Sequence, residues 1–544
     1  DLSYEKGATA RAELIGVEVE KFVLPEDVTK EALIAQLEAI NADDSIHGCL
    51  MFRPLPKHLK ADQDEICNHL AACKDVDCMT DLSNAGVFTG KKLGFAPCTP
   101  QACMEILDYY GIDCKGKPIL EVDVMTEDGI LGRASSPSGI SAGMHEAFVL
   151  RDGDPAWHDG NGVFKAVSMI NDVIGPASVG MDVMDQRAYD RFLAELDGTS
   201  NKSKLGGNST YSASLAVLRA AAATERKPLY KMLNAEPVKT IPLPTANCFS
   251  GGSYQKHSMP FQEVTIVPYK AKTLQEAVHI VTSVYGKMPA AIEKFSGKAA
   301  IPGSLSSFKC PSASPDDAYA IVSMAAEMAG MPDKIAFAAD CAFSEIYDAA
   351  TGKYDLCDVI MDTDQLIDTL EALTEKYNFL YIEDPIDEND WDSWAKASKR
   401  LKRTMLVGDD LTVTNIERLK IAVEKQACKA FIFKPNQVGT VTESMDAAKY
   451  AAEHGILSIP SIRAGGVNDD PIVDMAIALG SPCIKSGPPR NGAPSFYAVR
   501  QILMKSQSAL YMKGAKYEPG KWSLLHETSR WQSDLSRRSG KRSV

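Results

Sequence analysis

The stretch FLYIED (379–384) decides the fold, because four apolar residues run directly into the acids Glu383 and Asp384. Similar apolar runs flank it along the chain, each separated from the next by an amphipathic helical stretch. They are IAFAAD (335–340), TMLVGDD (404–410), KAFIFK (429–434), ILSIPS (456–461) and PCIKSG (482–487). Nearly all-apolar strands that alternate with helices are typical of a parallel sheet covered on both faces. The region 335–507 therefore predicts six βα units.

Residues upstream of these units complete a closed barrel. A strand pair near Ile241–Cys248 and Gln262–Val267, followed by a helix around Leu274–Tyr285, brings the predicted strands to eight. An α/β chain of this kind is expected to form a (β/α)8 barrel.

Two further units precede the barrel. Strand-like LEVDVMT (120–126) and GILGRAS (129–135), followed by an Ala-rich helical stretch, predict a smaller α+β domain. Residues 1–112 combine an amphipathic helix with a predicted strand at GCLMF (48–52). We expect four parts: 1–112, the α+β domain 113–235, the barrel 236–512 and a basic tail 513–544.

Composition excludes several classes of function. The 544 residues carry 58 Lys+Arg against 72 Asp+Glu, a net charge of −14 that disfavours nucleic acid as the main partner. No apolar run approaches the ~18–20 residues of a membrane span. Thirteen cysteines without a CxxC pair predict free thiols in the cytoplasm or another reducing intracellular compartment.

The predicted strands end on charged residues. Since the active site of a (β/α)8 barrel lies at the carboxyl ends of its strands, these charges are expected to meet at one mouth. They are Asp340, Glu383, Asp409, Lys434, Lys485 and, just after its strand, Arg463.

This set of side chains supports one kind of chemistry. Asp340, Glu383 and Asp409 supply the hard oxygen ligands that suit Mg²⁺. A lysine near a divalent cation and a second ammonium has its neutral form favoured, so Lys434 and Lys485 supply a candidate general base. Proton removal α to a carboxylate gives an enediolate that adjacent cations stabilise.

Residues 113–512 resemble the enolase (phosphopyruvate hydratase) family over many motifs. The motifs are PSGISAGMHEA (137–147), LRDGD (150–154), LDGTSNKSKLGGN (196–208), SGGS (250–253), IEDPIDENDW (382–391), VGDDLTVTN (407–415) and KPNQVGT (434–440). The resemblance implies an α+β capping domain, an enolase-type barrel with a ββαα(βα)6 order, two Mg²⁺ ions and usually a homodimer. It implies a carbon–oxygen lyase that dehydrates 2-phosphoglycerate to phosphoenolpyruvate.

The resemblance also implies roles for individual positions. Asp340, Glu383 and Asp409 match the ligands of the first metal, and Ser141 matches a serine that meets the second. Lys434 matches the catalytic base and Lys485 the lysine that binds the substrate carboxylate. Gln262 and Glu263 match a pair near the reacting hydroxyl. Arg463 matches the arginine that binds the phosphate.

The chain departs from the enolase pattern at several positions that matter for dehydration. The glutamate that helps the hydroxyl leave has become Leu305, and its neighbouring aspartate Ser304. The two family histidines are Tyr254 and Ile462, and a phosphate-binding serine is Ala464; His257 is an alternative to the lost histidine. General acid–base groups contribute ~10²–10⁴-fold, so impaired dehydration is expected.

Residues 2–117 resemble another family, the catalytic domain of methylenetetrahydrofolate dehydrogenase/cyclohydrolase. The motifs are SYEKGATARAELIG (3–16), HGCLMFRPLPKH (47–58), CKDVDCMTDLSNAG (73–86), FAPCTP (95–100) and YGIDCKGK (110–117). The lysine expected four residues after Tyr4 is Ala8, and an expected glutamine is Phe52, while Asp77 is retained. Folate redox chemistry is therefore disfavoured. We expect the segment to be a truncated α/β domain that serves as a packing or docking module.

Two functions remain open from the sequence. The first is a lyase that acts on a phosphorylated hydroxy acid. The second is a pseudoenolase that serves as a structural subunit of a larger assembly.

Overall fold

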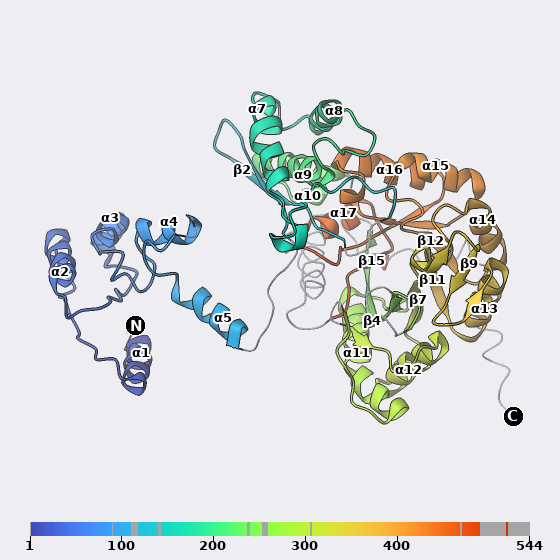
Figure 1. Ribbon diagram of the computed structural model, residues 1–544, viewed down its shortest axis with the longest axis horizontal. Helices are drawn as coiled ribbons and strands as arrows, with labels where there is room; N and C mark the ends of the chain where they lie inside the picture. The colour runs from blue at the N-terminus through green and yellow to red at the C-terminus, as the bar shows by residue number, and fades with distance from the viewer. Residues whose placement is uncertain are drawn as a thin grey trace. The chain divides into compact units, whose positions relative to one another are not determined.

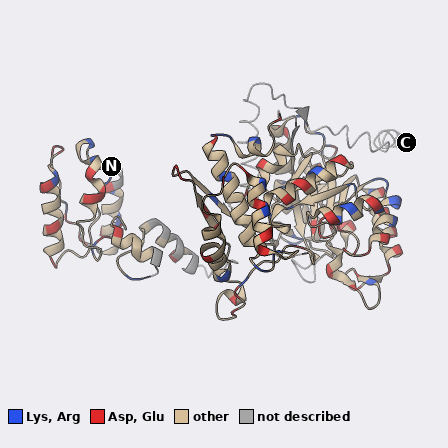
Figure 2. Cartoon of the chain, turned by 90° about the horizontal axis from the view of Figure 1, so that it is seen from above, with Lys and Arg blue, Asp and Glu red and all other residues tan. Residues whose placement is uncertain are grey.

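The chain forms two compact units, Asp1–Gly116 and Lys117–Val544 (Figure 1). The computed structural model describes residues 2–89, 91–109, 118–139, 143–236, 240–252, 259–304, 307–467, 470–489 and 518–519. Charged residues of both signs are interspersed over the outer helices (Figure 2). Among the described residues, no helix combines the length and apolarity needed to cross a membrane.

The first unit is built from short helices around a core of its own. They are α1 (Leu2–Ile15), α2 (Lys30–Ala42), the 3₁₀ helix η1 (Lys57–Asp62), α3 (Gln63–Cys67), α4 (Asp81–Thr89) and α5 (Cys98–Tyr109). Leu33, Leu37 and Ile40 recur at helical spacing on α2 and pack with Ile66 and Leu70. The unit thus holds its own hydrophobic cluster.

The strand expected at residues 48–52 is wrong in extent. Only Cys49 pairs, as a single parallel bridge to Asp75. Strands need neighbours to satisfy their backbone groups, and a pair without a third strand is marginally stable. Asp75 lies in a loop and uses its carboxylate to accept the backbone N–H groups of Met79 at 2.9 Å and Thr80 at 2.8 Å.

The second unit opens with the predicted α+β domain. A hairpin of β1 (Glu121–Met125) and β2 (Leu131–Ser135) is antiparallel, with Val122 opposite Ala134. Its helical elements are η2 (His158–Gly160), α6 (Phe164–Ser168), η3 (Met169–Ile174), α7 (Gly175–Ser178), α8 (Gln186–Asp197), α9 (Gly207–Thr224) and α10 (Leu229–Leu233). Buried α9 packs against the hairpin at Gly132, where a Cβ atom would overlap the backbone of Ala216 and Ala220.

The predicted eight-stranded barrel is confirmed. Its strands are β4 (Leu243–Ser250), β5 (Glu263–Val267), β7 (Ala336–Asp340), β11 (Phe379–Glu383), β12 (Met405–Gly408), β13 (Ala430–Phe433), β14 (Leu457–Pro460) and β15 (Cys483–Lys485). Neighbouring strands pair in this order, and β15 returns to pair with β4. A bridge from Ser461 to Lys485 joins β14 to β15 and completes the ring. Strand β5 is antiparallel to both of its neighbours, and the other pairs in the ring are parallel.

Helices cover the outside of the ring (Figure 1). They are α11 (Leu274–Ser296), α12 (Pro315–Met328), α13 (Thr363–Lys376), α14 (Trp391–Arg400), α15 (Ile416–Lys425), α16 (Val441–Glu453) and α17 (Ile472–Ala478). Two helices, α11 and α12, follow β5, in agreement with the ββαα(βα)6 order that the resemblance implied; the residue pattern alone had indicated only the first of them. The helix expected after residues 482–487 lies outside the described residues, as does the basic tail apart from residues 518–519.

Short elements complete the unit. They are β3 (Thr240–Ile241), β6 (Phe308–Lys309), η6 (Phe343–Ile346), β8 (Tyr347–Asp348), β9 (Lys353–Asp355), β10 (Ile360–Met361), η7 (Pro435–Gln437) and β16 (Glu518–Pro519).

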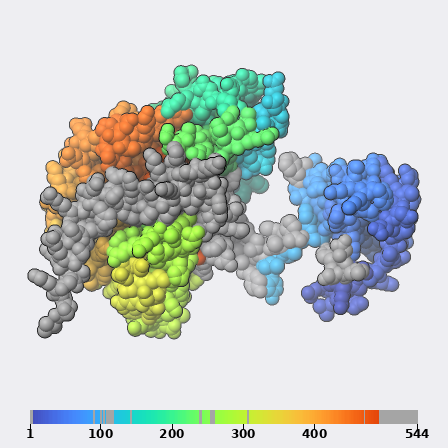
Figure 3. All heavy atoms as spheres, turned by 180° about the vertical axis from the view of Figure 1, so that it is seen from behind, coloured from blue at the N-terminus to red at the C-terminus, as the bar shows by residue number. Residues whose placement is uncertain are grey.

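The α+β domain lies directly against the barrel at α16 (Figure 3). Buried Asp190 accepts the backbone N–H of Thr442 at 2.8 Å, and Ser214 Oγ accepts that of Val441 at 3.0 Å. These side chains satisfy free N–H groups in the first turn of α16. The domain therefore caps a barrel helix, which fixes its loops relative to the strand ends.

Gly132→Ala tests the close approach of α9 to the hairpin. We expect the free energy of unfolding to fall by about 1–3 kcal/mol, because the added methyl group forces the helix away. All five tryptophans follow residue 117, so tryptophan fluorescence during urea unfolding reports on the second unit alone. Gly286→Ala, within α11 with no atom within 4 Å of its added Cβ, is the control and should not destabilise. Equal unfolding of Gly132→Ala and the parent chain would contradict the packing.

Candidate active site

Strand register brings three acids to one level of the barrel. Glu263 begins β5 and Glu383 ends β11, and both pair with Asp340, the last residue of β7. Residues directly opposite on neighbouring strands point to the same face with their Cβ atoms about 5 Å apart. Because β5 runs antiparallel, its first residue lies at the same end of the ring as the last residues of β7 and β11.

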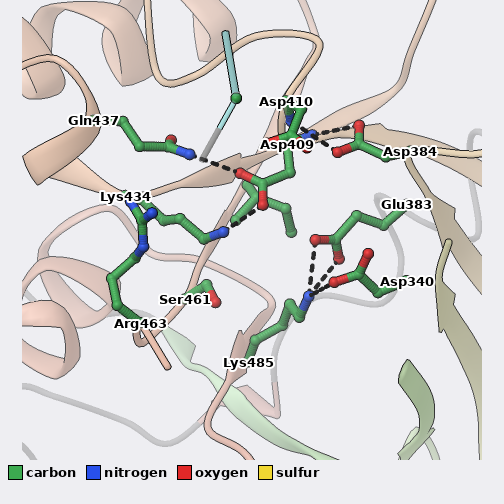
Figure 4. Close-up of polar contacts among 12 residues, drawn as sticks. Asp340, Glu383, Asp384, Asp409, Asp410, Lys434, Gln437, Ser461, Arg463 and Lys485 are labelled. Carbon is green, nitrogen blue, oxygen red and sulfur yellow. Dashed lines mark hydrogen bonds and ion pairs between the residues drawn. The ribbon is translucent and has the colours of Figure 1, made fainter. Parts of the chain in front are cut away.

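The ammonium of Lys485 lies among these acids (Figure 4). Its Nζ is 2.9 Å from Asp340 Oδ2, 2.7 Å from Glu383 Oε2 and 3.4 Å from Glu263 Oε2. Burial alone would lower the pKa of Lys485, but the three carboxylates raise it well above its ordinary value. Burial, and then repulsion by Asp340, raise the pKa of Glu383 well above its ordinary value against the opposing effect of Lys485. The oxygens of these acids thus converge on one cationic position.

A second group forms beside the first, on the next two strands. Asp409 follows β12 and Lys434 follows β13; Lys434 Nζ donates to Asp409 Oδ2, and Gln437 Nε2 donates to Asp409 Oδ1 at 3.0 Å (Figure 4). Burial raises the pKa of Asp409, but Lys434 and Lys485 lower it below its ordinary value overall.

The groups around Lys434 act on its pKa in opposite directions. Burial lowers the pKa of Lys434, as do Arg463 and Lys485, but attraction by carboxylates that include Asp409 and Glu383 leaves it above its ordinary value. A neutral Lys434 therefore requires that the charge of Asp409 be engaged elsewhere.

The sequence interpretation missed Asp384, which directly follows Glu383. The carboxylate oxygens of Asp384, Asp409 and Asp410 lie within 4.8 Å of one another, close enough to hold a metal ion. Asp384 already accepts the backbone N–H of Asp409 at 2.9 Å and that of Asp410 at 2.7 Å. We interpret Asp384 as the residue that orients the turn after β12, leaving Asp409 as the acid presented to the mouth.

Gln262 has an orphaned oxygen in this region. Its Nε2 donates to Asp340 Oδ2 at 3.3 Å, while buried Oε1 has no hydrogen-bond partner among the described residues. An unsatisfied buried acceptor costs about 1–3 kcal/mol, so a ligand that donates to it is favoured here.

Arg463 follows β14 and forms a bidentate pair with Glu146 of the α+β domain. The NH1 atom lies 3.1 Å from Glu146 Oε2 and NH2 lies 3.1 Å from Oε1, with both side chains buried. Ile462, at a family histidine position, packs against the barrel core. Ser141, Tyr254, His257 and Leu305 lie outside the described residues.

The acids fit a hard divalent cation. The position of the Lys485 ammonium shows that oxygens of Asp340 and Glu383 already meet around one positive charge, and carboxylate oxygens are the ligands that Mg²⁺ prefers. Orphaned Gln262 Oε1 adds an acceptor beside Asp340.

Comparison with known proteins agrees with this geometry. Residues 238–503 match the model of the enolase C-terminal TIM barrel domain, and residues 104–233 match that of the enolase N-terminal domain. Residues 1–77 match the catalytic domain of tetrahydrofolate dehydrogenase/cyclohydrolase. The chain is 39% identical to the enolase of Methanococcus aeolicus and 38% identical to that of Methanococcus maripaludis, in each case over 70% of this chain and 89% of the relative. The predicted enolase-type fold and the folate-enzyme resemblance are confirmed.

Lys485→Met tests the convergence of the acids. We expect the free energy of unfolding of the second unit to fall by about 3–5 kcal/mol, because buried carboxylates lose their compensating charge. Added Mg²⁺ should recover part of this loss through binding to the folded state. The measurement is urea unfolding by tryptophan fluorescence with and without Mg²⁺. The control Lys376→Met removes an exposed ion pair with Asp316 and should leave unfolding unchanged. An unaltered midpoint for Lys485→Met would show that the acids do not depend on this ammonium.

Proposed function

The chain belongs to the enolase family, and we propose that its barrel mouth binds a phosphorylated hydroxy acid with Mg²⁺ and removes the proton α to the carboxylate. The observation that carries this proposal is the convergence of acids from neighbouring strand ends beside half-buried Lys434 and buried Lys485. The reaction is the dehydration of 2-phosphoglycerate to phosphoenolpyruvate, at an impaired rate.

Metal binding is assigned to Asp340, Glu383 and Asp409, with Ser141 at a second ion. When bound, Mg²⁺ supplies positive charge that stabilises the enediolate formed from the substrate carboxylate. The family match and the acidic groups at the mouth support this assignment.

Lys434 is the proposed base. A lysine accepts a proton only when neutral, and here the Asp409 carboxylate keeps its pKa high. A cation bound to Asp409 would weaken this attraction, while Arg463 and Lys485 favour the neutral amine. The pair of Lys434 and Asp409 thus links proton abstraction to occupancy of the site.

The remaining charged groups suit the ends of such a substrate. Lys485 is assigned to the carboxylate and Arg463, whose planar fork matches phosphate geometry, to the phosphate. Gln262 and Glu263 are assigned to the reacting hydroxyl. Burial raises the pKa of Glu263 against the opposing effect of Lys485, so its protonated form is favoured relative to that of an exposed glutamate.

The hydroxyl-leaving step is the proposed weak point. Hydroxide leaves slowly without a proton donor, and the family acid is Leu305 while Ile462 and Ala464 replace polar groups. Proton abstraction at carbon 2 is therefore expected to outpace elimination.

A pseudoenolase that serves as a structural subunit is the second candidate. The packing of Ile462 on the barrel core favours it, since an apolar side chain there supports the fold and offers no proton. A homodimer or a larger assembly is proposed in either case. Buried free thiols at Cys248, Cys310 and Cys341 suit the cytoplasm or another reducing compartment.

Isotope exchange separates the two candidates. In D₂O with Mg²⁺, we expect exchange of the carbon 2 hydrogen of 2-phosphoglycerate by nuclear magnetic resonance, and phosphoenolpyruvate formation far below the ~1–10³ s⁻¹ of ordinary enzymes. Lys434→Met should abolish exchange, whereas Lys420→Met, on the exposed face of α15, should not. Turnover at ordinary rates would refute impairment, and Mg²⁺ binding without any exchange would favour the pseudoenolase.

A further inference from the structure

Glu146 receives hydrogen bonds from three separate segments. Its Oε1 accepts from Gly143 N at 3.2 Å, from Gln437 Nε2 at 3.3 Å and from Arg463 NH2 at 3.1 Å. Its Oε2 accepts from Arg463 NH1 at 3.1 Å and NH2 at 3.2 Å. A surface ion pair would not draw on this many donors.

The backbone around Glu146 is tied to the barrel as well. The N–H of Ala147 donates to the carbonyl of Gln437 at 2.7 Å. This bond holds the backbone from which the Glu146 side chain extends. The Glu146 side chain is 7% exposed and that of Arg463 5%. Removal of one partner would leave a buried charge uncompensated, and the pair is therefore a rigid part of the site.

The contacts continue to the reacting groups. Gln437 Nε2 donates to both Glu146 Oε1 and Asp409 Oδ1, and Asp409 in turn holds Lys434. Thr414 Oγ1 donates to Gln437 Oε1 at 3.0 Å, which fixes the orientation of the amide. Glu146 thus contacts the proposed phosphate-binding arginine directly, and it connects to the proposed base Lys434 through Gln437 and Asp409.

We infer that Glu146 is a positioning residue, through which the α+β domain holds the guanidinium of Arg463 in the orientation that receives the phosphate. The inference rests on the proposed function, because that function assigns Arg463 to the phosphate. A bidentate carboxylate fixes the plane of a guanidinium, and a pre-oriented plane loses less conformational freedom when an anion binds. The opposite reading, in which Glu146 competes with the phosphate for Arg463, predicts the reverse change in affinity.

The test is calorimetric titration of the full chain with 2-phosphoglycerate and, separately, with glycerate, both in the presence of Mg²⁺. Glu146→Gln keeps the shape of the side chain and removes its charge. It should lower the affinity for 2-phosphoglycerate about tenfold to a hundredfold. Affinity for glycerate, which lacks the phosphate, should be unchanged. Glu146→Asp retains the charge and should recover part of the lost affinity.

Glu388→Gln is the matched control. Glu388 accepts the backbone N–H of Met144 at 3.3 Å, next to Gly143, which donates to Glu146. Within the described part of the chain, the hydrogen bonds of Glu388 do not reach Arg463 or Gln437. It should leave both affinities unchanged.

Several results would overturn the inference. One is unchanged or tighter binding of 2-phosphoglycerate by Glu146→Gln. The other is an equal loss of affinity for 2-phosphoglycerate and glycerate, which a general loosening of the fold would cause. Inorganic phosphate, as a third probe, separates this failure from that of the proposed function. Phosphate binding without 2-phosphoglycerate binding would refute the proposed substrate, while Glu146→Gln could still be compared using phosphate. Binding of neither anion by the parent chain would overturn both.

Discussion

Concentration of negative charge at one end of the barrel is the constraint on which the site depends. Pairing of β5, β7 and β11 places Glu263, Asp340 and Glu383 at one level, where Asp340 and Glu383 are buried and Glu263 is half-buried. Two like charges 4 Å apart repel by about 4 kcal/mol at an effective dielectric constant of 20. Lys485 on β15, the strand that closes the ring, offsets this repulsion through its ion pairs with Asp340 and Glu383.

The other half of the mouth depends on elements outside the strand ring. Asp409 and Lys434 follow neighbouring strands, but their orientation comes from Gln437 in η7 and from Glu146 in the α+β domain. Asp190 fixes that same domain at the start of α16. The α+β domain therefore orients side chains of the site, through the contacts of Glu146 with Gln437 and Arg463. The electrostatic effect of Lys485 on Asp409 joins the two halves.

The sequence predicted those features that depend on local pattern. Alternating apolar runs predicted the strands. An acid or lysine at or near the end of five runs, and Arg463 after the sixth, predicted the residues of the mouth, because parallel strands end on one edge. Contacts between distant segments were beyond such reasoning. Nothing local in PSGISAGMHEA marks Glu146 as the partner of Arg463, which lies 317 residues away. The close approach of Asp409 to Lys434 was also beyond local pattern, because only tertiary packing sets that distance. The strand at 48–52 was overestimated because an apolar run does not reveal whether neighbours exist to pair with it.

The energetics of the mouth bear on the choice between enzyme and scaffold. Burying several carboxylates and lysines costs desolvation energy, and well-packed apolar replacements of buried ion pairs are often neutral or stabilising. A barrel that served only as a structural subunit would gain nothing from Asp340, Glu383, Asp409, Lys434 and Lys485 together. The chain already carries an apolar side chain, Ile462, packed on the core near the mouth, so apolar replacement is compatible with this fold. The charged groups that remain are those able to bind a cation and an anionic substrate, whereas the replaced groups include the glutamate, now Leu305, that the resemblance assigns to departure of the hydroxyl. This division favours a site that still binds and abstracts a proton but completes elimination slowly.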